Sequence, residues 1–445
     1  MRPRLNRRGR FFLTPETNRL KDVCSLVRFS NSLRALNSTN YRLFFAGQGL
    51  SMLGNWMTLT ASAWLIYELS NNPFYLGFLP FANQIPVLLL APLGGLLGDR
   101  FPRQRLMWWL NCACAAQAAT LAVLTLIGEI TVTRLLILVT IRGFINAAEF
   151  PTRQAFIVDL VDRKVDLPNA IALNSSLFNA ARLVGPAIAG IIIATAGPGV
   201  CYLIDATSYA AILTSILAMR LPRRRTKTKR RNSPLTDLRG GVDYVRRTPS
   251  LQASLIMIPM IAFAGFASST LAPIFARDVF GGDSKTLGIL FSSVGAGALI
   301  SAVMLARRPS PEGLPNWILL GSFSLALGQL GVALSPWFWF TIICMMGTGF
   351  GTVLCMAGNN TLIQSQVADD KRSRVMGLFA MGQGMFPLGS LAFGGIAATL
   401  GPRWAVGIAS VATAGAGLQF IRARRQLHRI RPPRRPPPLP SDSVV

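Results

Sequence analysis

Four ionisable residues stand inside long apolar stretches of the sequence: Arg142, Glu149, Arg182 and Asp205. On membrane-insertion scales a charge at the centre of an apolar helix costs about 2.5–3.5 kcal/mol, so we expect each of the four to have a partner or a function. A carboxylate in such surroundings can carry a proton, because burial disfavours its charged form and a nearby arginine favours it. The chemistry that these residues suit is ion pairing and proton transfer.

The spacing of these residues suggests two groupings. With a rise of about 1.5 Å per residue, Arg142 and Arg182 are expected at similar depth, with Asp205 about 7 Å below the outer end of its segment. We therefore expect Asp205 to pair with Arg182 or Arg142 in one conformational state of the protein. Glu149 lies two turns after Arg142 and four residues before Arg153. A structural Glu149–Arg153 ion pair and a proton-coupling role for Glu149 both remain open.

The elements that position these residues are long apolar segments. Hydrophobic residues make up 51% of the chain and charged residues 14%, and the mean hydropathy is +0.43, values typical of membrane proteins. We predict an all-α polytopic membrane protein with twelve transmembrane helices. The predicted spans are 44–67, 76–98, 106–127, 133–152, 170–195, 200–219, 251–276, 286–305, 316–334, 337–358, 375–398 and 403–421.

The net charge of +27 is distributed along the chain in a way that argues against nucleic-acid binding. The connections after the even-numbered spans are basic, and the connections after the odd-numbered spans are nearly neutral. This is the positive-inside pattern, which predicts that both termini are cytoplasmic. We expect the basic loops to contact anionic lipid on the cytoplasmic face and expect no nucleic-acid partner.

The predicted organisation is two six-helix bundles related by an internal duplication. Shifting the sequence by about 206 residues along itself aligns Gly143 with Gly349. The tail 1–42 lacks the apolar region of a secretory signal peptide, and a transit peptide is the less favoured alternative to a cytoplasmic tail. The expected parts are a basic N-terminal tail (1–42), a first bundle (43–220), a basic linker (221–250), a second bundle (251–421) and a basic, proline-rich, disordered tail (422–445).

No group of residues suits an enzyme or a metal site. The chain has one histidine, His428, which lies in the C-terminal tail, and its six cysteines form no ligand pattern. We expect no metal and no cofactor, with protons as the coupling ion.

The stretch 94–105 reads GGLLGDRFPRQR and joins the second and third predicted spans. It resembles the signature loop of the major facilitator superfamily. Pro102 and Gln104 depart from the family pattern, which usually has glycine and a basic residue there. The resemblance implies two pseudo-symmetric bundles and a cytoplasmic gate, in which Asp99 and Arg100 act against the start of the eleventh span. The residues that fit the signature are Gly95, Asp99, Arg100, Arg103 and Arg105.

The fifth predicted span carries a second motif, in which Gly185, Pro186 and Gly190 fit a helix-bending pattern of proton-coupled exporters. The surrounding 151–182 resembles the drug:proton antiporter branch, which includes macrolide and siderophore exporters. The resemblance implies a secondary transporter that exports a small amphiphilic molecule by alternating access, coupled to proton influx. The alternative for the motif alone is close helix packing.

Uncharged polar residues in the central spans are candidates for lining the substrate cavity, although isolated amides also bind helices together. They are Gln48, Asn55, Gln84, Asn174, Asn179 and Gln383. We expect a monomer in a bacterial cytoplasmic membrane that binds a small-molecule substrate. The alternative functions are an uptake carrier of the same fold and a non-transporting membrane sensor.

Overall fold

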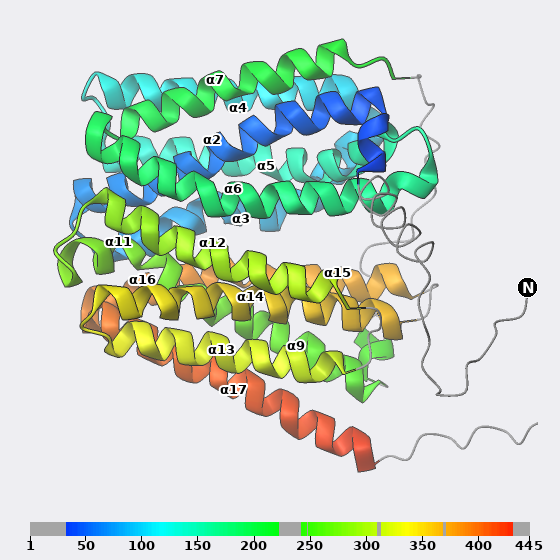
Figure 1. The fold of residues 1–445 in the computed structure, drawn as a ribbon, viewed down its shortest axis with the longest axis vertical. Helices are drawn as coiled ribbons and strands as arrows, with labels where there is room; N and C mark the ends of the chain where they lie inside the picture. Colours follow the sequence, from blue (N-terminus) through cyan, green and yellow to red (C-terminus); the bar gives the residue numbers. More distant parts are fainter. Residues whose placement is uncertain (1–32, 222–241, 247, 309–312, 368–370, 430–445) are drawn as a thin grey trace, which may run out of the picture.

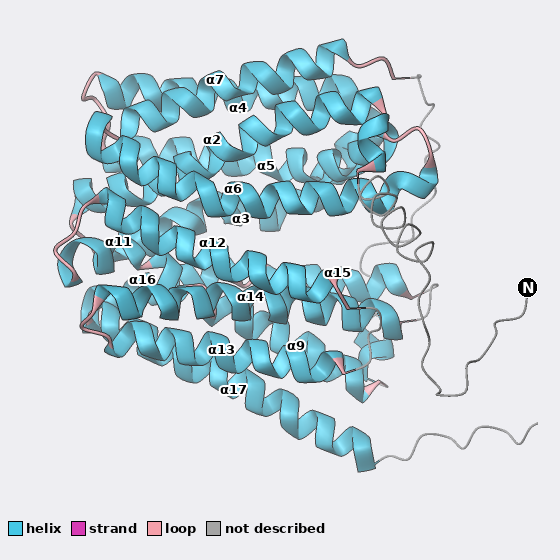
Figure 2. Cartoon of the chain, viewed as in Figure 1, coloured by secondary structure: helices cyan, strands magenta, loops and turns pink. Residues whose placement is uncertain are grey.

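The computed structural model describes residues 33–221, 242–246, 248–308, 313–367 and 371–429; at 91–100 it describes the helix but not the side chains. Every regular element in these ranges is helical (Figure 2). We call the end of the molecule where α2 begins and α17 finishes the near end. The opposite end, on the left in Figure 1, is the far end.

The first group of helices corresponds to the first six predicted spans, and each span is one continuous helix. Their bounds are α2 (Thr39–Ser70), α3 (Pro73–Arg100), α4 (Arg103–Leu126), α5 (Val132–Leu160), α6 (Leu167–Ala196) and α7 (Pro198–Ala218), with short 3₁₀ turns η1 (Arg34–Asn37) and η2 (Lys164–Asp166). Within this group α2 packs against α6 and α7, α3 against α5, and α4 against α5 and α7.

The second group contains two broken spans. Its elements are α9 (Pro249–Ala264), α10 (Ala267–Thr270), α11 (Ala272–Ile274), the π-helix η3 (Phe275–Val279), α12 (Ser284–Ala306), α13 (Leu314–Leu334), α14 (Phe338–Gln366), α15 (Arg372–Gln383), α16 (Phe386–Leu400) and α17 (Pro402–Arg429). The predicted spans 251–276 and 375–398 are both present, but each is divided into shorter helices. Pro273 and Pro387 lack the N–H groups that would continue the preceding helical turns.

Within the described residues, eleven helical stretches are long and apolar enough to cross a membrane, and they match eleven of the twelve predicted spans. The remaining prediction falls in α2, which does not reach that hydropathy. Its polar residues Gln48 and Asn55 contribute to the shortfall. α2 is nevertheless 32 residues long, and it packs against four helices of the first group, α3, α5, α6 and α7.

Two turns at the far end have the same construction. Gly197 joins α6 to α7 with φ 82° and ψ 167°, and Gly401 joins α16 to α17 with φ 90° and ψ 160°. Only glycine adopts this backbone region without strain. Pro198 and Pro402 then begin the next helices. The separation of the predicted spans 375–398 and 403–421 is thus confirmed, as is that of 316–334 and 337–358, where Ser335 caps the end of α13.

Among the described residues, the two groups contact each other most extensively through two helix pairs, α3 with α16 and α6 with α12. Glycines allow the close approach: a Cβ on Gly394 would lie 2.7 Å from the Cα of Gly77, and one on Gly288 would lie 2.6 Å from the oxygen of Pro186. These contacts run from the far end to mid-depth. α15, the near-end half of its span, packs against α9 and α14 of its own group. The groups are therefore joined most closely at the far end.

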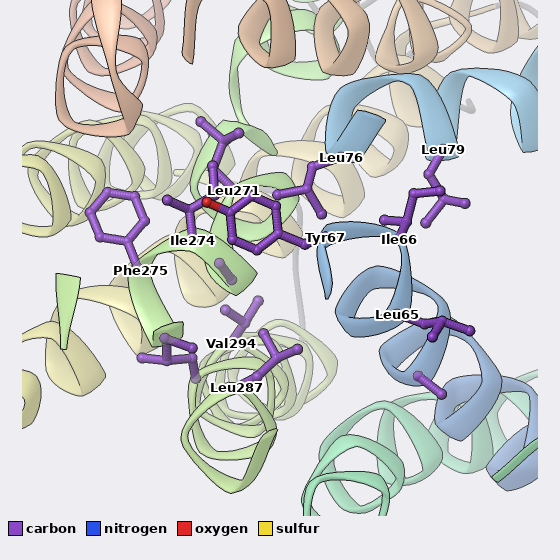
Figure 3. Close-up of a cluster of buried hydrophobic side chains, with 14 of the residues drawn as sticks. Leu65, Ile66, Tyr67, Leu76, Leu79, Leu271, Ile274, Phe275, Leu287 and Val294 are labelled. Atoms are coloured by element: carbon purple, nitrogen blue, oxygen red, sulfur yellow. The ribbon is translucent and has the colours of Figure 1, made fainter. Parts of the chain in front are cut away.

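A cluster of buried apolar side chains crosses between the groups at the far end (Figure 3). Leu65 and Ile66 of α2 and Leu76 of α3 belong to it together with Leu271 and Phe275 of the second group. Because these residues come from both groups, this cluster reinforces the contact made by the helix pairs.

Candidate functional site

Two of the four charged residues in the spans meet in one polar cluster, which we call the Arg142 cluster: Asn55, Thr58, Arg142, Asp205 and Tyr209. Arg142 Nη2 donates to Asn55 Oδ1 at 3.1 Å, and its guanidinium lies 5.5 Å from the centroid of the Tyr209 ring. Asp205 is 1% exposed, and its Oδ2 accepts a hydrogen bond from Thr58 Oγ1 at 2.9 Å.

The cluster contains more polar atoms than its hydrogen bonds satisfy. Asp205 Oδ1 and Arg142 Nη1 are buried without a hydrogen-bond partner among the described residues. Gly54 makes room for this carboxylate, since a Cβ there would lie 2.7 Å from Asp205 Oδ1. Asp205 and Arg142 interact electrostatically, yet the described side chains show no ion pair between them. The expected pairing of Asp205 in one access state stays a prediction.

Arg182 lies against another face of α2. Its guanidinium is 5.8 Å from the centroid of the Trp56 ring, and Phe178 meets the same ring edge to face at 5.6 Å. Gly185 allows α6 this close to α2, because a Cβ there would lie 2.7 Å from the Cβ of Trp56. Asn55 and Trp56 are consecutive, so Arg142 and Arg182 both contact one turn of α2. Their expected similarity in depth agrees with this arrangement.

Glu149 forms the ion pair with Arg153 that its spacing suggested, with 3.4 Å between Oε1 and Nη1. Glu149 is buried and Arg153 also lies 5.8 Å from the Phe150 ring centroid. Both charged residues belong to α5, so the pair does not itself join two helices. A proton-coupling role for Glu149 stays a prediction.

The described part of the signature loop holds the near end of the first group together. Gly95, Asp99 and Arg100 lie in the part of α3 whose side chains are not described, so the gate contact of Asp99 and Arg100 stays a prediction. Arg103 Nη1 donates to Asp159 Oδ2 of α5 at 2.8 Å. Arg105 is exposed.

Gln104, at a position where the family usually has a basic residue, joins α4 to the end of α7. Its Nε2 donates to the backbone oxygens of Ile216 at 2.8 Å and Met219 at 3.0 Å. A neutral amide can bond two carbonyl oxygens without bringing a charge into this contact. The departure from the family pattern therefore has a structural explanation.

The helix-bending motif lies in a continuous helix that packs closely on both sides. Pro186 is inside α6, and Gly190 faces α12, where a Cβ would lie 2.7 Å from the oxygen of Ser284. Ser284 Oγ in turn donates to the oxygen of Gly190 at 3.0 Å. The packing alternative is thus observed in this state.

The six candidate cavity residues do not form one cluster. Asn55 is exposed and bonded to Arg142, whereas Gln48 is buried in α2. Gln383 is exposed beside the break between α15 and α16. The other three, all partly buried, are Gln84, Asn174 and Asn179. Asn179 donates to the oxygen of Ser175 within α6, so at least one amide serves its own helix.

The sequence interpretation missed a polar connection between the groups at the far end, which we call the far-end tie. Tyr67 Oη donates to Asp278 Oδ2, and Arg277 Nη1 donates to Asn71 Oδ1 at 2.9 Å. Arg277 also lies 5.7 Å from the Tyr67 ring centroid. The adjacent charges Arg277 and Asp278 at the end of a span were the available signal, but nothing in the sequence indicated their partners.

Comparison with known proteins places the chain among transporters. A family model described as transmembrane secretion effector matches residues 30–431. The staphyloferrin A transporter of Staphylococcus aureus is 30% identical over 79% of this chain and 87% of that protein. The enterobactin exporter of Shigella boydii is 26% identical, covering 74% and 77%. Macrolide efflux protein A of Streptococcus pyogenes is 20% identical, covering 76% and 85%.

The fold also resembles that of solved transporters. A bacterial homologue of the human lysosomal transporter Spinster, in its inward-facing and occupied conformation, has a TM-score of 0.69 at 13% identity. The similarity covers 90% of this chain and 99% of that one. At this identity the similarity establishes the fold alone.

Proposed function

Because the chain belongs to the transmembrane secretion effector family of the major facilitator superfamily, we propose that it exports a small amphiphilic molecule from the cytoplasm by alternating access, driven by proton influx. It is a multi-pass membrane transporter and not an enzyme. Two relatives support export as the direction of transport. They are an enterobactin exporter and a macrolide efflux protein, each aligned over about three quarters of the chain.

The helix contacts support alternating access between the two groups. The groups approach closely from the far end to mid-depth through α3 with α16 and α6 with α12. The basic loops and tails predict that the near end is cytoplasmic. With this orientation the structure has its outer side closed, the state in which an exporter loads substrate from the cytoplasm.

For the proton, Asp205 is a better candidate than Glu149. Glu149 already forms an ion pair, with Arg153 at 3.4 Å. Asp205 is 1% exposed, forms no ion pair with a described side chain and keeps one oxygen unbonded. Arg142 acts on it electrostatically, Thr58 donates a hydrogen bond to it, and Tyr209 and Cys114 are the other titratable groups near it. A carboxylate so placed can be neutral in one access state and charged in the other.

The test is uptake into inside-out vesicles, whose interior corresponds to the cell exterior. Labelled staphyloferrin A, enterobactin and a macrolide are the probes, each with and without an inwardly acidic pH gradient. Export predicts that at least one probe accumulates and that collapsing the gradient abolishes accumulation. Accumulation only in right-side-out vesicles would identify an uptake carrier. Binding of a probe without transport in either orientation would favour the sensor.

A further inference from the structure

Arg142 and Arg182 lie on either side of one turn of α2, at mid-depth in the first group. Asn55 contacts Arg142 and the next residue, Trp56, contacts Arg182. The backbone of Arg182 and Leu183 also packs against α12, since a Cβ on Gly295 would lie 2.7 Å from Leu183 Cα. The site is therefore at the junction of α2, α6 and α12, where the two groups meet.

The charges at this site do not balance. Neither arginine forms an ion pair with any described side chain. Among the described carboxylates, Asp205 acts electrostatically on Arg142, and none acts on Arg182 in the same way. Even with Asp205 ionised, the two guanidinium groups leave one positive charge uncompensated. The ion pairs that the described residues do form, such as Arg103–Asp159, include neither of these arginines.

An uncompensated guanidinium inside a membrane protein is costly, so it is retained where function requires it. Arg182 is partly buried, and its guanidinium forms no hydrogen bond with a described residue. Leu59 of α2 lies one helical turn beyond both Asn55 and Trp56, between the faces that contact the two arginines, and is 49% exposed. A ligand that reaches this face of the helix therefore meets a cation with its donors free.

The aromatic neighbours indicate what else the ligand contains. Trp56 and Phe178 form an edge-to-face pair beside Arg182. Aromatic side chains next to a guanidinium suit a molecule with both an apolar body and an anionic group, since the guanidinium fork matches a carboxylate in geometry. An inorganic anion would gain nothing from these rings.

We propose that the substrate is an organic carboxylate, with Arg182 binding the carboxylate, Arg142 providing the second positive charge and Trp56 packing against the apolar part. This inference rests on the proposed transport function for its physiological meaning, but the site itself is testable by binding alone. It narrows the substrate from an amphiphile of any charge to an anionic one.

The experiment measures binding to the purified full-length protein in detergent by thermal shift and calorimetry. The probes are a panel of aryl and alkyl mono-, di- and tricarboxylates, each compared with its neutral amide. The variants are Arg182→Gln, Arg182→Lys and Trp56→Leu. Arg134→Gln is the matched control, because Arg134 is exposed and paired with Glu129 at 2.8 Å near the far end.

For the wild type we expect at least one acid to bind tenfold or more tightly than its amide. Arg182→Gln should weaken the acid by about 10- to 100-fold, the loss expected for a charge-assisted hydrogen bond, and leave the amide unchanged. Arg182→Lys should recover part of the difference, and Arg134→Gln should have no effect.

The proposal is overturned if no acid in the panel is preferred to its amide, or if Arg182→Gln weakens both equally. The transport assay is separate. If the acid binds through Arg182 but no vesicle orientation accumulates it, the anion site stands and the export function fails. If neutral probes are exported while acids do not bind, export stands and the anion site fails.

Discussion

Two adjacent glycines in α16 allow a controlled test of how the far end closes. A Cβ on Gly394 would lie 2.7 Å from the Cα of Gly77, whereas one on Gly395 would have no neighbour within 4 Å. Non-bonded carbons normally lie about 3.5–4.0 Å apart, so Gly394→Ala must move α3 and α16 apart by about 1 Å. Both substitutions raise helix propensity equally, and only the first disturbs the contact between groups.

Overpacking of this size costs about 1–3 kcal/mol. The cost applies to the state in which the far end is closed and disappears when α3 and α16 separate. Gly394→Ala should therefore increase the ratio of far-end-open to far-end-closed molecules by about 5- to 150-fold, and Gly395→Ala should leave it nearly unchanged.

The assay is pulsed electron paramagnetic resonance between spin labels at positions 129 and 337, both exposed at the far end on different groups. The labels are attached in a background without native cysteines. We expect the longer-distance population to grow in Gly394→Ala. Equal distance distributions for the two alanine variants would refute the idea that the Gly77–Gly394 contact closes the far end.

Three further outcomes are expected. Tyr67→Phe removes the hydrogen bond to Asp278 in the far-end tie, so the same spin-label pair should report a larger far-end-open population. An unchanged distance distribution would show that this hydrogen bond does not stabilise the closed state. Asp205→Asn should abolish the response of transport to a pH gradient in inside-out vesicles while Glu149→Gln retains it, and the reverse result would assign the proton to Glu149. Gly197→Ala places a side chain at φ 82°, so thermal unfolding in detergent should show a loss of about 1–3 kcal/mol, and wild-type stability would contradict the strain argument.

The sequence predicted features that depend on local chemistry. Hydropathy located eleven of the spans, and glycine followed by proline marked the turn at Gly401. Arg142 and Asp205 stood out because charge is rare in apolar helices, and the structure brings them into one cluster. The Glu149–Arg153 pair followed from helical spacing.

Features that depend on contacts between distant segments could not be read in this way. The break at Gly384 lies within a span whose average hydropathy hides it. The partners of Asp278 and Arg182 are aromatic residues of α2, Tyr67 and Trp56, and no local pattern pairs residues so far apart in the chain. The polar residues that place α2 among the other helices also lowered the hydropathy by which spans are recognised.

The two broken spans distinguish the second group of helices from the first. Gly265 and Gly384 lie at the two breaks, and the rings of Phe266 and Phe386 beside them meet at 4.9 Å. All six described spans of the first group are single helices, and that group holds Arg142 and Arg182. The interruptions at Gly265 and Gly384 therefore place two points of bending in the second group, joined by one aromatic contact, on the opposite side of the groups' interface from Arg142 and Arg182.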